Sequence, residues 1–213
     1  MANERGKLSP LEILHTGPVV PVVVLRNADH AVSLAKALLA GGIRVMEITL
    51  RSGAAALDGI RRISAEVPEI IVGAGTVLTS DDLRSVAQVG GQFAISPGLT
   101  PSLFAAAHDG PIPLIPGIAT ASELMLAQER GFTELKFFPA EAAGGVPMLK
   151  ALHGPFPRVT FCPTGGISQE NCKEYLTLAN VACVGGSWLT PPELLEKENW
   201  DAITELAAKA AGR

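Results

Sequence analysis

A single lysine stands in a stretch where lysine is uncommon. Lys136 lies within the apolar run 134–140, after Gly131 and shortly before Pro139, and the run has the pattern of a buried β-strand. Because side chains alternate along a strand, Lys136 and Phe138 are expected on the same face. An amine held among aromatic rings is poorly solvated, which favours its neutral form, and a neutral amine attacks carbonyl carbon. One interpretation of the run is therefore a lysine that forms a Schiff base.

The same lysine also fits a structural role. A lysine near a strand end can lay its stem along apolar surface while its ammonium group reaches water. Such lysines are far commoner than nucleophilic ones, so the run by itself favours the structural interpretation. The choice between the two depends on the residues that the fold brings close to Lys136.

A second strand-like run, residues 45–51, carries three polar residues on one face. Period-two alternation sets Glu47, Thr49 and Arg51 on that face and apolar side chains on the other. Burying these groups without a function would be costly, although an internal ion pair between Glu47 and Arg51 would also account for them. A carboxylate can transfer protons, and the planar fork of an arginine suits a carboxylate ligand. The row therefore favours a catalytic or binding role.

Two later strand-like runs each end in a pair of glycines beside a hydroxyl residue. In barrels of parallel strands, phosphate is often held by backbone N–H groups of the loops after strands seven and eight, together with a helix N-terminus. Each glycine pair alone is typical of an ordinary turn, but the two together at these positions predict a phosphate site. Its residues are Thr164, Gly165, Gly166, Gly186 and Ser187.

Two other runs end in residues that could shape a pocket. Thr76 follows Gly73 and Gly75, which allow close approach of the backbone, although a glycine pair that only helps a barrel to close is a serious alternative. Pro97 begins a Pro-Gly turn that would form a rigid rim. These positions add a hydroxyl group and an apolar wall to the groups already described.

These residues require a fold that gathers the ends of several strands. Strand-like runs alternate with amphipathic segments, and the runs end 20 to 27 residues apart, near Leu25, Leu50, Val77, Gly98, Ile118, Ala140, Gly166 and Trp188. The amphipathic segments are residues 29–40, 54–66, 80–89, 101–108, 121–130, 146–152, 168–178 and 200–211. Eight such units in about 200 residues predict an α/β fold, a TIM (β/α)8 barrel.

The barrel is expected to form one domain over residues 1–213, preceded by a short N-terminal helix that begins at Ser9 and Pro10. The main rival is a doubly wound open sheet, which would normally have fewer units and a glycine-rich dinucleotide turn after its first strand. Neither feature is found in the sequence. In a barrel, functional groups lie at the carboxyl ends of the strands.

Composition narrows the partners. The chain has 213 residues, 47% of them hydrophobic, and a net charge of −4 with dispersed basic residues, which disfavours nucleic-acid binding. Its opening ten residues lack the apolar core of a signal peptide, and no apolar run approaches a membrane span. We therefore expect a soluble, cytoplasmic protein. The four histidines and three cysteines fit no metal-ligand spacing, so no metal site is expected.

Five stretches together resemble the 2-keto-3-deoxy-6-phosphogluconate (KDPG) aldolase and 4-hydroxy-2-oxoglutarate (KHG) aldolase family. They are GGIRVMEITLR at 41–51, VGAGTV at 72–77, FAISPG at 93–98, LKFFPA at 135–140 and FCPTGGIS at 161–168. The resemblance extends from about residue 16 to residue 188 and covers nearly the whole chain. No departure is visible at the positions that carry it.

The resemblance implies a class I aldolase that cleaves KDPG to pyruvate and glyceraldehyde 3-phosphate, a reaction of the Entner-Doudoroff pathway, and that also acts on 4-hydroxy-2-oxoglutarate. It assigns the imine to Lys136 and proton transfer to Glu47. It assigns binding of the substrate carboxylate to Arg51 and Thr76, and the walls of the pocket to Pro97 and Phe138. It assigns binding of the substrate phosphate to Thr164, Gly165, Gly166, Gly186 and Ser187. It further implies a homotrimer without cofactor or metal, whose partners are small keto acids and sugar phosphates.

Two other functions remain open at the level of the sequence. A phosphate-binding barrel isomerase or synthase could use Lys136 only as a positive charge, and a covalent imine would separate it from an aldolase. A non-catalytic barrel that binds sugar phosphates would bind without turnover, although the combination of Lys136, Glu47 and Arg51 argues against it.

Overall fold

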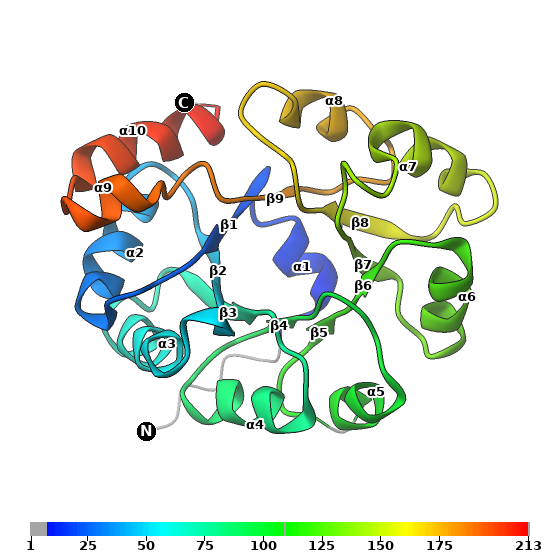
Figure 1. The fold of residues 1–213 in the computed structure, drawn as a ribbon, viewed down its shortest axis with the longest axis horizontal. Coiled ribbons are helices and arrows are strands. Elements are labelled where there is room, and N and C mark those ends of the chain that lie inside the picture. Colours follow the sequence, from blue (N-terminus) through cyan, green and yellow to red (C-terminus); the bar gives the residue numbers. More distant parts are fainter. Residues whose placement is uncertain (1–7, 109, 213) are drawn as a thin grey trace.

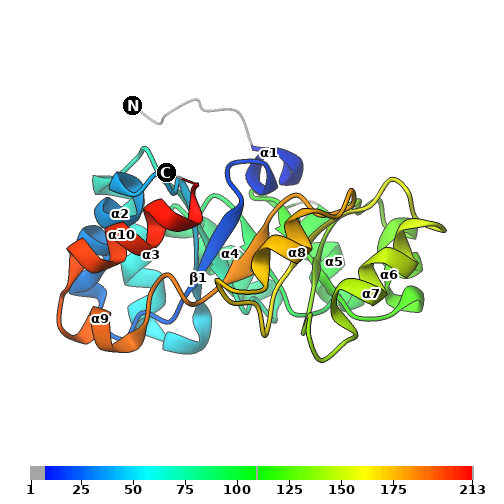
Figure 2. The ribbon, with the colours of Figure 1, turned by 90° about the horizontal axis from the view of Figure 1, so that it is seen from above.

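Parallel strands surround the centre of the molecule and helices cover their outer side (Figure 1). The computed structural model describes residues 8–108 and 110–212, so that residues 1–7 of the opening segment lie outside the described residues. Helix α1 (Pro10–Leu14) lies across one end of the strands, as the view from above shows (Figure 2). The predicted α/β class with parallel strands is confirmed.

The strands are short. They are β1 Val19–Val23, β2 Val45–Thr49, β3 Ile71–Gly75, β4 Ala94–Ile95, β5 Leu114–Ile115, β6 Gly117–Ile118, β7 Glu134–Phe137, β8 Thr160–Pro163 and β9 Val184–Gly186. One sheet has the order β5-β4-β3-β2-β1-β9 and the other has the order β6-β7-β8. Isolated bridges pair Thr164 with Gly185 and Phe161 with Val181, so β8 and the segment leading into β9 also lie side by side.

Helices follow the strands along the chain. They are α2 Ala31–Ala40, α3 Ala54–Glu66, α4 Ser80–Gln88, α5 Pro101–His108, α6 Ala121–Glu129, α7 Gly145–His153, α8 Cys172–Leu176, α9 Pro192–Glu196 and α10 Trp200–Ala210, with 3-10 turns η1 Ala28–His30 and η2 Leu50–Ser52. Thr79 and Thr120 begin α4 and α6 with reciprocal side-chain caps, which fix where these helices start.

The strands bury both of their faces. Met46 and Ile48 of β2 point to the helices and belong to the large outer core, as do Leu135 and Phe137 of β7. Val45 points the other way, into a smaller apolar cluster enclosed by the strands and covered by Ile13 and Leu14 of α1. This cluster fills the amino end of the enclosed space, which leaves the polar side chains of the strands toward the carboxyl end.

Some of the predicted elements differ from the structure. The segment 168–178 is helical only at Cys172–Leu176, because Ser168 N–H donates to the side chain of Asn171 and the chain turns before the helix begins. Helix α9, which starts after Pro191, was not predicted. The fifth strand is divided into β5 and β6 around Pro116, a residue without an N–H for the ladder.

No helix within residues 8–108 and 110–212 is long and apolar enough to cross a membrane. The same residues contain no group of three or more His, Cys, Asp or Glu side chains that could hold a metal ion.

Candidate active site

Two charged side chains meet inside the ring of strands. Nζ of Lys136, on β7, lies 3.5 Å from Oε1 of Glu47, on β2, and the two side chains are 7% and 2% exposed. The ammonium group also lies 5.1 Å from the ring centroid of Phe138, within the range of a cation–π contact. The separation of the two charged atoms exceeds that of a tight hydrogen bond, so this is an ion pair with room for movement.

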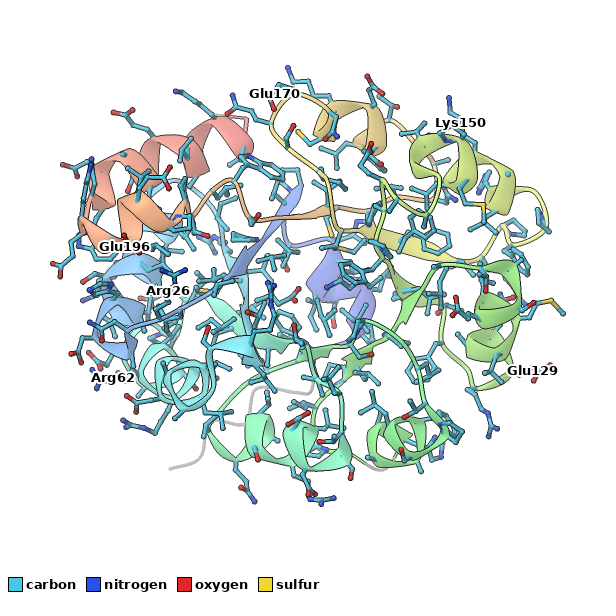
Figure 3. All side chains as sticks on the ribbon, in the orientation of Figure 1. Arg26, Arg62, Glu129, Lys150, Glu170 and Glu196 are labelled. Atoms are coloured by element: carbon cyan, nitrogen blue, oxygen red, sulfur yellow. The ribbon has the colours of Figure 1, made fainter. Side chains whose placement is uncertain are left out.

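Glycine makes the space for the carboxylate. Glu47 is paired in register with Gly73, yet its carboxylate lies against Gly75, one step closer to the carboxyl end. A Cβ atom on Gly75 would stand 1.6 Å from Oε1 of Glu47. The missing side chain therefore lets Glu47 lean toward the open end of the ring, where Lys136 meets it. Figure 3 shows the side chains that the strands and helices carry, in the orientation of Figure 1.

This arrangement is suited to chemistry on a carbonyl group. Proton transfer from the Lys136 ammonium to the Glu47 carboxylate would yield a neutral amine and a carboxylic acid at the same time. The amine is then a nucleophile and the acid a proton donor for the oxygen that the amine displaces. A buried pair is costly to maintain for stability alone, which favours this chemical role over the structural one considered for Lys136.

The predicted phosphate residues gather beside the segment that follows β7. Gly165 and Gly166 have φ angles of 101° and 79°, in the left-handed region that favours glycine. The N–H of Ala140 donates to the carbonyl of Thr164 at 2.8 Å, which fastens this turn to the chain leaving β7. The side chain of Thr164 is buried and occupies the space that Gly185 leaves.

The second glycine pair lies next to the first. The bridge between Thr164 and Gly185 brings Gly186 and Ser187 to the neighbouring strand end. Gly186 is buried, and a Cβ atom there would lie 1.7 Å from the Trp188 ring. Ser187 is exposed. The structure thus brings together the two turns that the sequence predicted to act as one site.

Thr76 and Pro97 lie at the ends of their strands, as predicted. Thr76 is half-buried and has a φ of 58°, which is an outlier for a β-branched residue and of the kind found at functional sites. Pro97 is half-buried, and its carbonyl oxygen would be 2.3 Å from a Cβ atom on Gly117. Since Gly117 pairs with Lys136, the Pro97 turn lies close to the lysine strand.

The prediction that Arg51 continues the polar face of its strand was wrong. Strand β2 ends at Thr49, and Arg51 belongs to the 3-10 turn η2, where its side chain is exposed. The alternation therefore stops before Arg51. In the described part of the chain the ion partner of Glu47 is Lys136, not Arg51. Arg51 nonetheless stands at the carboxyl end of β2.

Sequence reasoning noted that Gly75 allows close approach of the backbone, but it missed which groups three of the glycines admit, and it missed the contact of a tyrosine. Gly75, Gly117 and Gly185 occupy strand positions whose missing side chains admit a neighbour. Glycines inside strands were the available signal. Tyr175 of α8 is buried and donates a hydrogen bond to Glu141, a contact between segments that no local pattern could indicate.

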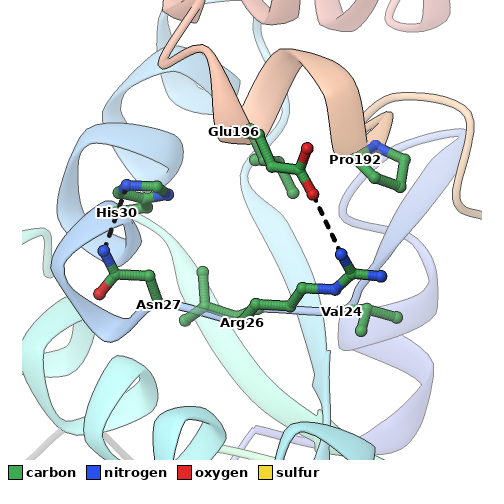
Figure 4. A pocket seen from close by; sticks show the side chains of 8 residues that line it. Val24, Arg26, Asn27, His30, Pro192 and Glu196 are labelled. Carbon is green, nitrogen blue, oxygen red and sulfur yellow. Dashed lines mark hydrogen bonds and ion pairs between the residues drawn. The ribbon is translucent and has the colours of Figure 1, made fainter.

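A separate pocket of about 240 Å³ lies where β1 ends, next to α9 (Figure 4). Arg26 spans its rim and donates to Glu196 at 3.0 Å. The lining is largely apolar and consists of Val24, Leu25, Arg26, Asn27, His30, Pro192, Leu195 and Glu196. None of the predicted site residues lines it.

Comparisons with known proteins agree on one family. The family model for KDPG and KHG aldolases matches residues 11–206. A KHG/KDPG aldolase of Escherichia coli is 59% identical over 97% of this chain and 97% of its own. A 2-dehydro-3-deoxy-phosphogluconate aldolase of Dickeya dadantii is 57% identical, also over 97% of this chain and 97% of its own.

Solved structures give the same result. The structure of a KDPG aldolase from Legionella pneumophila, described as holding pyruvate as a covalent carbinolamine intermediate, has a TM-score of 0.94 at 48% identity and covers 97% of this chain and 100% of its own. The structure of the KDPG aldolase of Zymomonas mobilis with 3-phosphoglycerate has a TM-score of 0.90 at 41% identity. It covers 97% of this chain and 96% of its own.

Replacing Gly75 by alanine should displace the Glu47 carboxylate, because the added Cβ would overlap Oε1. We expect a loss of turnover of roughly tenfold or more as the acid–base group is moved. Steady-state kinetics on the substrate proposed below measures the loss. Gly154→Ala is the matched control, since nothing lies within 4 Å of a Cβ atom there. Unchanged kcat in Gly75→Ala would contradict this account of how Glu47 is positioned.

Proposed function

The chain belongs to the KDPG and KHG aldolase family, and from this premise we propose that Lys136 is its Schiff-base residue and Glu47 its proton carrier. The protein is a class I aldolase, an aldehyde-lyase that cleaves KDPG to pyruvate and glyceraldehyde 3-phosphate and acts on 4-hydroxy-2-oxoglutarate. The observation that carries the proposal is the buried pair of Lys136 and Glu47, 3.5 Å apart.

The reaction begins with attack of the neutral Lys136 amine on the keto carbon. Glu47, now protonated, gives its proton to the oxygen of the carbinolamine, which leaves as water while the nitrogen lone pair forms the imine. The Glu47 carboxylate then removes the proton of the substrate's C4 hydroxyl group. The C3–C4 bond breaks, its electrons enter the protonated imine, and the aldehyde leaves.

The enamine that remains is the precursor of pyruvate. Its carbon takes up a proton to become an imine again, and water adds to that imine to release pyruvate and the free amine. Glu47 serves both directions because it alternates between carboxylic acid and carboxylate. The half-buried Phe138 ring near the amine limits the access of bulk water to these steps.

Two groups are proposed for the carboxylate end of the substrate. Arg51 and Thr76 follow the neighbouring strands β2 and β3, at the same end of the ring as the carboxylate of Glu47. A guanidinium on an exposed turn can reach a carboxylate in two parallel hydrogen bonds. Pro97 and Phe138 are proposed as the walls of the pocket, since both are half-buried beside the lysine strand.

The phosphate end is proposed to bind at Thr164, Gly165, Gly166, Gly186 and Ser187. The left-handed φ angles of Gly165 and Gly166 support this role, because turns of this kind can present successive backbone N–H groups to an anion. The adjacency of the two glycine turns through the bridge at Gly185 also supports it.

We also propose that the two sheets form one closed (β/α)8 barrel in a single domain over residues 1–213. The strands β5 and β6 would act as one strand interrupted at Pro116, and the bridges at Thr164 and Phe161 would join β8 to β9. The pairing of β9 with β1 supports closure on that side. An intact barrel sets the distance between Lys136 and Glu47.

Borohydride reduction in the presence of pyruvate should attach a pyruvyl group to Lys136, since reduction fixes an imine on the residue that formed it. Peptide mass spectrometry locates the adduct. Lys136→Met should give no adduct and no turnover while its circular-dichroism spectrum stays native, because methionine is of similar length. Turnover by Lys136→Met, or adducts only on exposed lysines such as Lys36 and Lys150, would refute the assignment.

Replacing Glu47 by glutamine should lower kcat by about 10² to 10⁴, the usual contribution of a general acid–base group. Stopped-flow assay of aldehyde release measures it. Glu134→Gln is the matched control, because Glu134 is also a strand carboxylate but begins β7 and accepts a hydrogen bond from Thr133. If both variants keep the parental kcat, another group moves the protons.

The family resemblance further supports a homotrimer that acts in the cytoplasm on its charged substrates. Sedimentation equilibrium of the purified chain should give three times the mass of 22.1 kDa. A mass equal to one or two chains at micromolar concentration would refute the trimer and leave the chemistry of Lys136 unaffected.

A further inference from the structure

The hydrogen bond between Tyr175 and Glu141 lies beside the proposed phosphate turn. We propose that Tyr175 and Glu141 are positioning residues for the phosphate end of the substrate: Tyr175 holds the Glu141 carboxylate away from the Gly165–Gly166 turn. The inference rests on the proposed cleavage of a phosphorylated substrate. It assigns to these residues the preference for phosphorylated over unphosphorylated substrate, not the chemistry at Lys136.

Glu141 lies directly against the proposed phosphate turn. It follows β7 five residues after Lys136, and its N–H donates to the carbonyl of Gly165 at 3.1 Å. A Cβ atom on Gly166 would stand 2.6 Å from Cγ of Glu141, so the stem of the glutamate covers this glycine. The direction in which the carboxylate at the end of that stem points therefore decides whether it faces an anion on the turn.

Tyr175 fixes where that carboxylate points. The tyrosine lies in α8, is 1% exposed, and donates its hydroxyl hydrogen to Oε1 of Glu141. A Cβ atom on Gly145 would lie 3.1 Å from the Tyr175 hydroxyl and 3.5 Å from Oε1 of Glu141. The start of α7 thus approaches the same contact, and three segments converge on it.

The hydroxyl group keeps its proton in this setting. Burial raises the pKa of Tyr175, and the hydrogen bond to Glu141 and the nearby charge of Glu174 raise it further. The tyrosine hydroxyl therefore always has a hydrogen to donate to the carboxylate. A hydrogen bond to an ionised group is among the stronger types. Without it, the freed carboxylate could swing over the turn and repel a phosphate dianion.

The charge and the hydrogen bond can be separated with two substitutions. Tyr175→Phe keeps the ring and frees the carboxylate, so the KM for KDPG should rise about fivefold while kcat/KM for 4-hydroxy-2-oxoglutarate changes less than about twofold. Glu141→Gln removes the charge but leaves an oxygen for Tyr175, so the KM for KDPG should not rise. The double variant should return toward the parental KM.

Steady-state kinetics on both substrates, with Kd for inorganic phosphate measured by calorimetry, tests the proposal. Thr204→Val is the control, because it also removes a partly buried hydrogen bond. That hydrogen bond runs from the Thr204 hydroxyl to the carbonyl of Ala37 and joins α10 to α2, away from the proposed phosphate turn. Equal loss on both substrates in Tyr175→Phe would mean a structural role and overturn the inference. A rise in the KM for KDPG in Glu141→Gln would also overturn the inference. Glu141 is exposed, so this substitution does not threaten folding.

These outcomes are distinct from failure of the proposed function. If the parental protein forms no adduct on Lys136 and does not cleave KDPG, the proposed function itself fails. If the parental protein does both and Tyr175→Phe keeps the parental ratio of KM values for the two substrates, only the positioning role fails.

Discussion

The buried ion pair between Lys136 and Glu47 is the constraint that the rest of the structure must satisfy. Taking two charges out of water is expensive, and for buried pairs of this kind the attraction between the charges can fall short of that cost. The two residues belong to different sheets, β7 in one and β2 in the other. The pair therefore exists only if the strands enclose a common space, and the surrounding apolar packing must supply the stability that the pair does not.

Glycines determine the shape of that space. Gly75 leaves room for the Glu47 carboxylate, Gly117 lets the Pro97 carbonyl approach, and Gly185 leaves room for Thr164. A glycine in a strand costs backbone entropy and contributes no packing of its own. Three strands accept this cost, and in each case the space is taken by a polar group of a neighbouring segment rather than by an apolar side chain.

Sequence periodicity predicted the polar face of each strand only where the strand persists. Glu47 and Lys136 were placed correctly because both lie inside regular extended backbone. Arg51 was placed wrongly, because a 3-10 turn begins at Leu50, directly after Thr49, and side chains there no longer alternate with a period of two. The break at Pro116 and the contact between Tyr175 and Glu141 depend on which strands and segments become neighbours, which is tertiary information.

The division between strands and turns has a functional meaning. The groups proposed for bond making, Lys136 and Glu47, lie on strands whose positions are fixed by ladders on both sides. The groups proposed for the two ends of the substrate, Arg51 and Ser187 among them, lie on turns beyond the strands. Turns can change in length and sequence without moving the ion pair. Under the proposed assignment, one pair of strand residues would serve substrates that differ only at their ends, and the contacts that fasten these turns, such as that of Glu141, would determine selectivity.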